Sequence, residues 1–88
     1  MAWAVRLSRE ALKDYKNLPR DAQERVGRAI DGLSVDPFMG DVKALKGPEW
    51  KGLYRKRVGP YRIIFAADPK SDVVGVTAIL RRSEKTYR

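Results

Sequence analysis

One stretch decides the fold: Leu53-Tyr54-Arg55-Lys56-Arg57-Val58-Gly59-Pro60-Tyr61-Arg62-Ile63-Ile64-Phe65. Two runs rich in apolar and β-branched residues flank Gly59-Pro60, which is a pattern typical of a β-hairpin. A two-residue turn with glycine first fits this dipeptide. The turn fixes the register of the two strands, so that Arg57 is expected directly opposite Arg62.

This register separates the hairpin into two faces, because directly opposed residues and residues two apart share a side. One face, called here the arginine face, carries Arg55, Arg57 and Arg62, with Ile64 beside them. The other face is mostly apolar and carries Tyr54, Val58, Tyr61, Ile63 and Phe65. Opposed like charges destabilise a sheet, so the arginine face is expected to stay open and bind an anion, foremost a phosphate backbone. The alternative is a solvated strand edge without a ligand.

The composition predicts a single globular domain over residues 1–88, with 43% hydrophobic and 34% charged residues. Histidine and cysteine are both missing from the sequence, which excludes the usual zinc sites, histidine acid–base catalysis and thiolate chemistry. No cofactor or metal is therefore expected. The sequence has neither a signal-peptide pattern nor an apolar run long enough for a membrane span, so a cytoplasmic location without membrane contact is expected.

The charge is strongly basic and unevenly placed. The formal net charge is +8 and the isoelectric point is about 10.1. Between Lys43 and Ala67, seven cations face one acid, Glu49. A basic surface in the C-terminal half indicates a nucleic acid or another polyanion as partner, against the alternative of a merely soluble basic protein.

Two helices are predicted before the hairpin. Ser8 is a good N-cap, and the apolar positions after it recur at helical spacing, which predicts a helix from Arg9 to about Asn17. Pro19 then opens a second helix, whose apolar stripe reaches Leu33 before Asp36-Pro37 ends it. A helical hairpin is the expected result.

Two further strands complete the expected layout. Trp3–Leu7 alternates in polarity, and the β-branched run Val73–Leu80 is predicted to be a central strand. The glycine- and proline-containing segment 37–52 is expected to be an irregular connection. The order is β-α-α-β-β-β, an α+β fold in which the helical hairpin covers the apolar face of a small, mainly antiparallel sheet. Lys56 falls on the covered face and is expected to extend its ammonium group outward.

With these features in place, the chain resembles the RelE family of the RelE/ParE superfamily, toxins of type II toxin–antitoxin pairs. Three motifs carry the resemblance over nearly the whole length: Leu45-Lys46-Gly47, the hairpin quoted above, and Arg81-Arg82-Ser83-Glu84-Lys85-Thr86-Tyr87-Arg88. The resemblance implies a RelE-like fold and a metal-independent endonuclease that cleaves mRNA in the ribosomal decoding site. It also implies a cognate antitoxin that neutralises the toxin.

The resemblance also assigns site residues. The family's catalytic positions fall on Arg55, Arg57, Arg62 and the base-stacking Tyr87, and its C-terminal arginine falls on Arg81 or Arg82. Some members carry lysine where Arg57 stands, and arginine is a much poorer proton-transfer group. A packing role is the alternative for Tyr87. Nearby cations are expected to contact RNA: Lys43, Lys46, Lys51, Lys56, Arg82, Lys85 and Arg88.

Three functions remain in competition at this point. The leading one is the mRNA endonuclease, acting on message in the ribosome. The second is a ParE-like toxin that inhibits DNA gyrase, although such chains usually have longer helices and lack the paired arginines and the terminal motif. The third is a catalytically silent RNA-binding module. For a toxin we expect an acidic, helical antitoxin segment to cover the basic face, giving a toxin–antitoxin hetero-oligomer.

Overall fold

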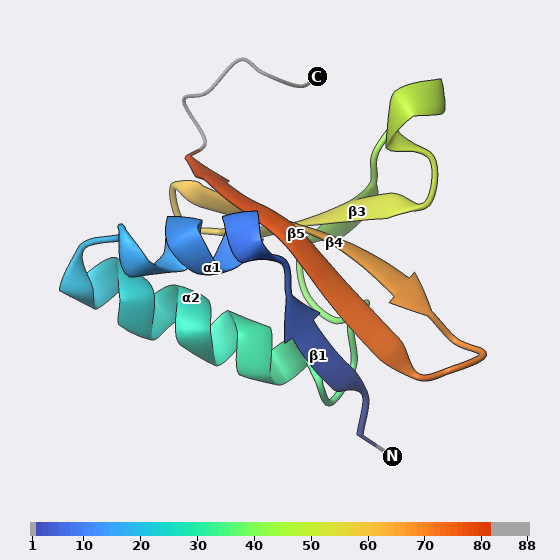
Figure 1. Cartoon of the computed structure of the whole chain (residues 1–88), viewed down its shortest axis with the longest axis horizontal. Coiled ribbons are helices and arrows are strands. Elements are labelled where there is room, and N and C mark those ends of the chain that lie inside the picture. The colour runs from blue at the N-terminus through green and yellow to red at the C-terminus, as the bar shows by residue number, and fades with distance from the viewer. Residues whose placement is uncertain (1, 82–88) are drawn as a thin grey trace.

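The computed structural model describes residues 2–81, which form one sheet and one helical layer (Figure 1). In chain order the elements are β1 Ala4–Leu7, α1 Arg9–Lys16, α2 Arg20–Leu33, β2 Val42–Ala44, the 3₁₀ helix η1 Pro48–Trp50, β3 Leu53–Val58, β4 Tyr61–Asp68 and β5 Val73–Arg81. Within this part of the chain, the strands form a five-stranded sheet in the order β1-β5-β4-β3-β2. β1 runs parallel to β5 and the other neighbours are antiparallel, which confirms the α+β prediction and the central place of the last strand.

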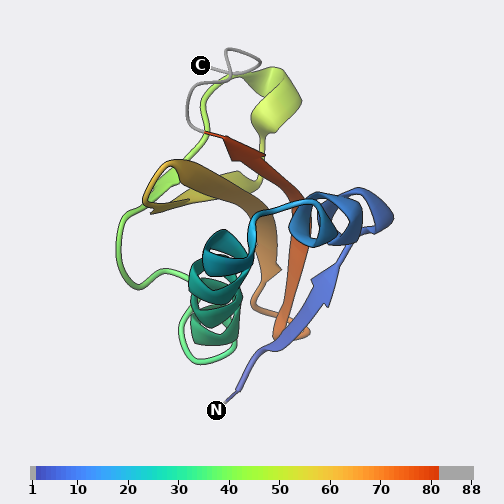
Figure 2. The same cartoon turned by 90° about the vertical axis from the view of Figure 1, so that its left-hand side faces the viewer.

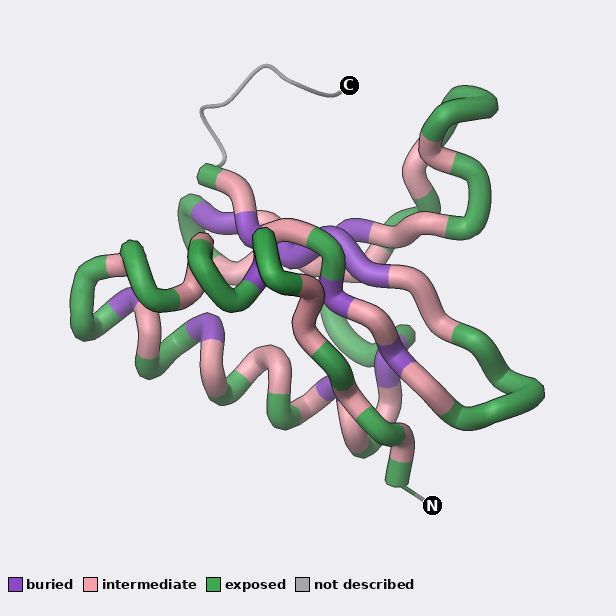
Figure 3. The backbone as a smooth tube through the Cα atoms, in the orientation of Figure 1, coloured by how far each residue is buried: buried purple, intermediate pink, exposed green. Residues whose placement is uncertain are grey.

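Both helices cover the same face of the sheet (Figure 2). Their apolar positions meet the hairpin face that was predicted to be covered, and burial concentrates where the two layers touch (Figure 3). The buried core consists of Ala11, Ala22, Val26, Leu33, Tyr61, Ile63, Phe65, Val74, Val76 and Ile79. Removing this apolar surface from water is the main force that holds the two layers together.

The hairpin register is the predicted one. Val58 pairs with Tyr61 and Arg57 pairs with Arg62. Gly59 has a φ of +57°, in the left-handed region that the first position of this turn requires. A methyl group at Gly59 would also lie 2.6 Å from a guanidinium nitrogen of Arg25, so a larger residue here would have to displace the Arg25 side chain in addition to adopting the positive φ.

A β-bulge in β5 brings residues before and after it onto the same buried face of the strand. The pairing changes register between Ile64 and Phe65, which face Ala78 and Val76, and Thr77 is left over. Val76 before the bulge and Ile79 after it therefore both reach the core. This bulge explains why apolar and polar residues do not alternate strictly along β5.

The connection after α2 contains a strand that was not predicted. Residues 37–52 were expected to be irregular, yet Val42–Ala44 forms β2 and pairs antiparallel with β3. The strand is only three residues long, and the edge of β3 supplies its hydrogen-bond partners. The sheet therefore extends one strand beyond the hairpin.

The side chain of Ser8 joins α1 to β5 through two hydrogen bonds. Its side-chain oxygen accepts from the backbone N–H of Ala11 as an N-cap, at 3.0 Å, and its hydroxyl donates to the carbonyl oxygen of the bulge residue Thr77, also at 3.0 Å. Ser8→Ala is expected to lower the free energy of unfolding by about 1–2 kcal/mol, measured by urea denaturation. Ser8→Thr keeps the hydroxyl and serves as the control. An unchanged unfolding midpoint for Ser8→Ala would contradict this role.

Candidate nucleic-acid interface

The hairpin brings three predicted site residues together on the sheet face opposite the helices. Arg57 stands directly opposite Arg62, and Arg55 lies two residues from Arg57 on the same side. β2 adds Lys43, which pairs with Arg55 and so shares this face. Four cations thus lie on neighbouring positions of three adjacent strands, which is an arrangement suited to a polyanion.

The expectation that the arginine face stays open is wrong at Arg55. This residue is 8% exposed, and its guanidinium group donates to a side-chain oxygen of Asp41 at 3.2 Å and to the Asp41 carbonyl oxygen at 3.4 Å. Ile64, its partner in β4, is also buried, although it lies outside the helix-side core. A buried cation needs a partner of opposite charge, and Asp41 provides it.

Arg57 is held more loosely by the same carboxylate. Its Nε atom lies 3.7 Å from the second oxygen of Asp41, and its side chain is 36% exposed. That Nε atom is buried and has no hydrogen-bond partner within the described residues. Arg57 therefore presents a partly exposed cation, held by one long ion pair, to a ligand on the arginine face.

The structure separates the predicted RNA-binding lysines. Lys56 pairs with Ile63 on the helix-side face, as predicted, and its ammonium group donates to the carbonyl oxygen of Met39 at 2.9 Å in an exposed hydrogen bond. Lys46 and Lys51 are exposed on either side of η1, outside the arginine face. Of the predicted lysines that fall within residues 2–81, Lys43 is the one that joins the arginines.

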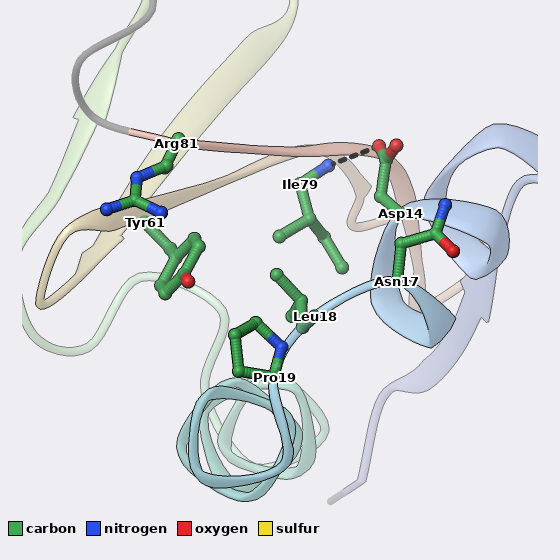
Figure 4. Close-up of a pocket in the computed structure, with 7 residues that line it drawn as sticks. All are labelled: Asp14, Asn17, Leu18, Pro19, Tyr61, Ile79 and Arg81. Carbon is green, nitrogen blue, oxygen red and sulfur yellow. Dashed lines mark hydrogen bonds between the residues drawn. The ribbon is translucent and has the colours of Figure 1, made fainter.

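Arg81 lies on the other side of the sheet. It pairs with Tyr61, and its guanidinium carbon lies 5.9 Å from the centre of the tyrosine ring. Both residues line a pocket of about 230 Å³ between the sheet and the junction of α1 and α2 (Figure 4). In that pocket Asp14 accepts a hydrogen bond from the backbone N–H of Ile79 at 3.0 Å. The structure therefore does not place Arg81 with the three hairpin arginines, and its predicted catalytic role stays a prediction.

Four predicted residues lie outside the described part of the chain: Arg82, Lys85, Tyr87 and Arg88. Their assignments from the family resemblance stay predictions. Among residues 2–81, no group of three or more histidine, cysteine or acidic side chains could hold a metal ion. Within the same range, no helix has the length and apolarity needed to cross a membrane.

Asp41 is the site residue that sequence reasoning missed. It lies 14 positions before Arg55, and it precedes a strand that was not predicted. The one available signal is Gly40-Asp41, since Gly40 has a φ of +89° and turns the chain into β2. An acid placed just before a strand that pairs with a basic strand can meet its cations.

The comparisons with known proteins now decide the family. A family model described as the ParE toxin of the type II toxin–antitoxin system parDE matches residues 5–86. The chain belongs to this toxin family, within the RelE/ParE superfamily. The toxin is also 29% identical over 91 residues to the candidate toxin RelE1 of Methanocaldococcus jannaschii, in a match that covers 100% of this chain and 98% of that protein.

Solved structures of RelE-type toxins have the same fold as this chain. One chain of the archaeal RelE–RelB complex from Pyrococcus horikoshii is 28% identical in sequence to the toxin. It superimposes with a TM-score of 0.79, and the match covers 96% of the toxin and 99% of the matched chain. The RelBE2 toxin–antitoxin complex from Mycobacterium tuberculosis is 24% identical with a TM-score of 0.83, over 93% of this chain and 100% of that chain. The RelE-like fold predicted from the sequence is confirmed.

Proposed function

We propose that this toxin is a ribosome-dependent endonuclease that cleaves mRNA in the decoding site. The observation that carries the proposal is the pairing of Arg57 with Arg62 on one face, with Arg55 and Lys43 beside them. Guanidinium groups are planar, permanently charged and able to bind phosphate oxygens in pairs. The similarity to RelE proteins supports the same reading.

The proposed reaction is attack by the ribose 2′-oxygen on the adjacent phosphorus. The 2′-hydroxyl loses its proton as the new P–O bond closes a 2′,3′-cyclic phosphate, the bond to the 5′-oxygen of the next nucleotide breaks, and that oxygen takes up a proton, so the net number of protons is unchanged. Arg57 and Arg62 are placed to stabilise the charge that develops on the phosphate oxygens, so the reaction draws on no metal ion. Arginine does not deprotonate in proteins, so these residues are poor bases. The toxin is therefore expected to have weak catalysis of its own, and we assign alignment of the 2′-hydroxyl to the ribosome.

A cognate antitoxin is the second part of the proposal. The archaeal and mycobacterial neighbours are complexes with RelB-type antitoxins. A net charge of +8 favours an acidic partner, and a helical segment is proposed to cover the basic face in a hetero-oligomer. A toxin that acts on translated message works where ribosomes are, which places it in the cytoplasm.

Inhibition of DNA gyrase is the second candidate function, because the matching family model is described as a ParE toxin. The arginine face is the observation against it, since an arrangement of paired arginines is suited to phosphate chemistry. A supercoiling assay with purified gyrase separates the two candidates. Inhibition of gyrase together with intact message would favour the ParE-like function.

The test of the proposed function is a defined in vitro translation reaction in which new 5′ ends of the message are mapped. The toxin is expected to produce cuts within codons on translated message, because alignment comes from the ribosome. The same message without ribosomes is the control and is expected to stay intact. Equal cleavage of naked RNA would contradict ribosome dependence, and intact message in both reactions would contradict the nuclease function.

A further inference from the structure

Three consecutive residues of β3 hold the segment Met39–Asp41. The side chain of Arg55 binds Asp41, the ammonium group of Lys56 binds the carbonyl oxygen of Met39, and the backbone N–H of Arg57 donates to the carbonyl oxygen of Asp41 at 3.0 Å. This backbone bond fixes Asp41 directly before β2, beside the arginine face. The backbone position of Asp41 is therefore set by the sheet, and its carboxylate is held by the ion pairs with Arg55 and Arg57.

The Asp41 carboxylate bridges two arginines. One oxygen lies 3.2 Å from an Arg55 nitrogen and the other lies 3.7 Å from the Nε atom of Arg57. A phosphate group can bind two guanidinium groups through two of its oxygens in the same manner. Asp41 thus supplies the anion that this pair of cations needs when no ligand is bound, and it reduces the repulsion among the four cations on this face.

The two ion pairs differ in a way that assigns different roles to the arginines. The side chain of Arg55 is 10% exposed and also binds the Asp41 carbonyl oxygen, so it is fixed. The side chain of Arg57 is 36% exposed, and its contact with Asp41 is too long for a hydrogen bond. Arg57 is the member of the pair that can exchange one anion for another.

We propose that Asp41 is a positioning residue, which fixes Arg55 in place and holds Arg57 until an RNA phosphate replaces the carboxylate on Arg57. This inference rests on the proposed function, since RNA is the incoming anion. It changes the predicted role of Arg55 from phosphate contact to support of the site.

The test compares Asp41→Asn with the wild-type toxin. Asparagine keeps the shape and one acceptor oxygen for Arg55 but removes the charge that competes with phosphate. Asp41→Asn is expected to bind a non-cleavable 2′-O-methyl oligonucleotide about threefold more tightly, because a competing ion pair is lost. Its single-turnover cleavage of translated message is expected to fall about tenfold or more, because Arg57 is no longer positioned. Glu49→Gln makes the same charge change at an exposed position within η1 and is the matched control.

Opposite changes in binding and cleavage support the proposal, because a residue that only maintains the fold would lower both. Binding by Asp41→Asn that is equal to or weaker than wild type, or cleavage that is unchanged, would overturn it. A second measurement needs no variant: the NMR signals of the arginine Nε–H groups in the wild-type toxin. Adding the oligonucleotide is expected to shift the signal of Arg57 and leave that of Arg55 in place. An unmoved Arg57 signal would overturn the proposal.

The two proposals can fail separately. If the wild-type toxin leaves translated message intact but the oligonucleotide shifts the Arg57 signal, the endonuclease function fails and the role of Asp41 in anion exchange stands. If the toxin cleaves message and Asp41→Asn cleaves equally well, the role of Asp41 fails and the endonuclease function stands.

Discussion

Arg62→Ala is expected to reduce cleavage of translated message by about 100-fold or more, the usual effect of removing one donor that stabilises charge in a transition state. Arg62 stands directly opposite Arg57 at the hairpin end of the arginine face. Losing its guanidinium group leaves the phosphate with a single partner from this pair. The measurement is the rate at which new 5′ ends appear in the translation reaction, at equal toxin concentration.

Two controls make this result specific. Arg28→Ala removes the same charge from an exposed position on α2 and is expected to cleave normally. Arg62→Lys keeps the charge but loses paired binding, so an intermediate rate is expected. Thermal unfolding of Arg62→Ala should match wild type. Full cleavage by a folded Arg62→Ala would show that this arginine does not stabilise the reacting phosphate.

Phe65→Ala is expected to destabilise the toxin by about 3–5 kcal/mol, the range for removing a buried aromatic side chain. Phe65 is fully buried, and its ring stacks on Tyr54 with centroids 5.7 Å apart and an interplanar angle of 24°. Its strand neighbours are Tyr54 and Val76, so the cavity would open between three strands. Small domains have total stabilities of about 5–15 kcal/mol, so this loss is a large fraction of the folding free energy. Urea denaturation followed by circular dichroism measures the loss.

Leu12→Ala is the matched control for this prediction. Leu12 lies on α1 and is 44% exposed, so its truncation removes an apolar side chain that is largely outside the core. The expected loss is below about 1 kcal/mol. Equal losses for Leu12→Ala and Phe65→Ala would contradict the location of the core between the helices and β3–β5.

The fold was predictable wherever local sequence chemistry decides it. Gly59-Pro60 fixes the hairpin register, and the apolar face predicted from that register is the one that the helices cover. β2 was not predictable, because its three residues lie in a glycine- and proline-containing segment and pair only through the free edge of β3. The bulge at Thr77 depends on tertiary packing, since it lets Val76 and Ile79 enter one core.

The cations of the site could be predicted from the sequence, but Asp41, the acid that pairs with them, could not. Opposed positions on one hairpin give the arginine face directly from the register. The contact between Asp41 and Arg55 depends on β2, so it could not be predicted before that strand was known. The face on which Arg81 lies could not be predicted either. The bulge puts Ile79 and Arg81 on the helix-side face of the sheet, and the sequence does not reveal the bulge.

The parallel pairing of β1 with β5 has a consequence for synthesis. Ala4 pairs with Val73 and Leu7 pairs with Val76, so the first strand finds its neighbour only after the last strand has been made. β5 is also the link between β1 and the β4-β3-β2 part of the sheet. Contacts between such distant residues form late, because a long loop must close first. We therefore expect a nascent chain that lacks residues 73–81 to have no joined sheet, and the folded toxin to arise only once β5 has left the ribosome that makes it.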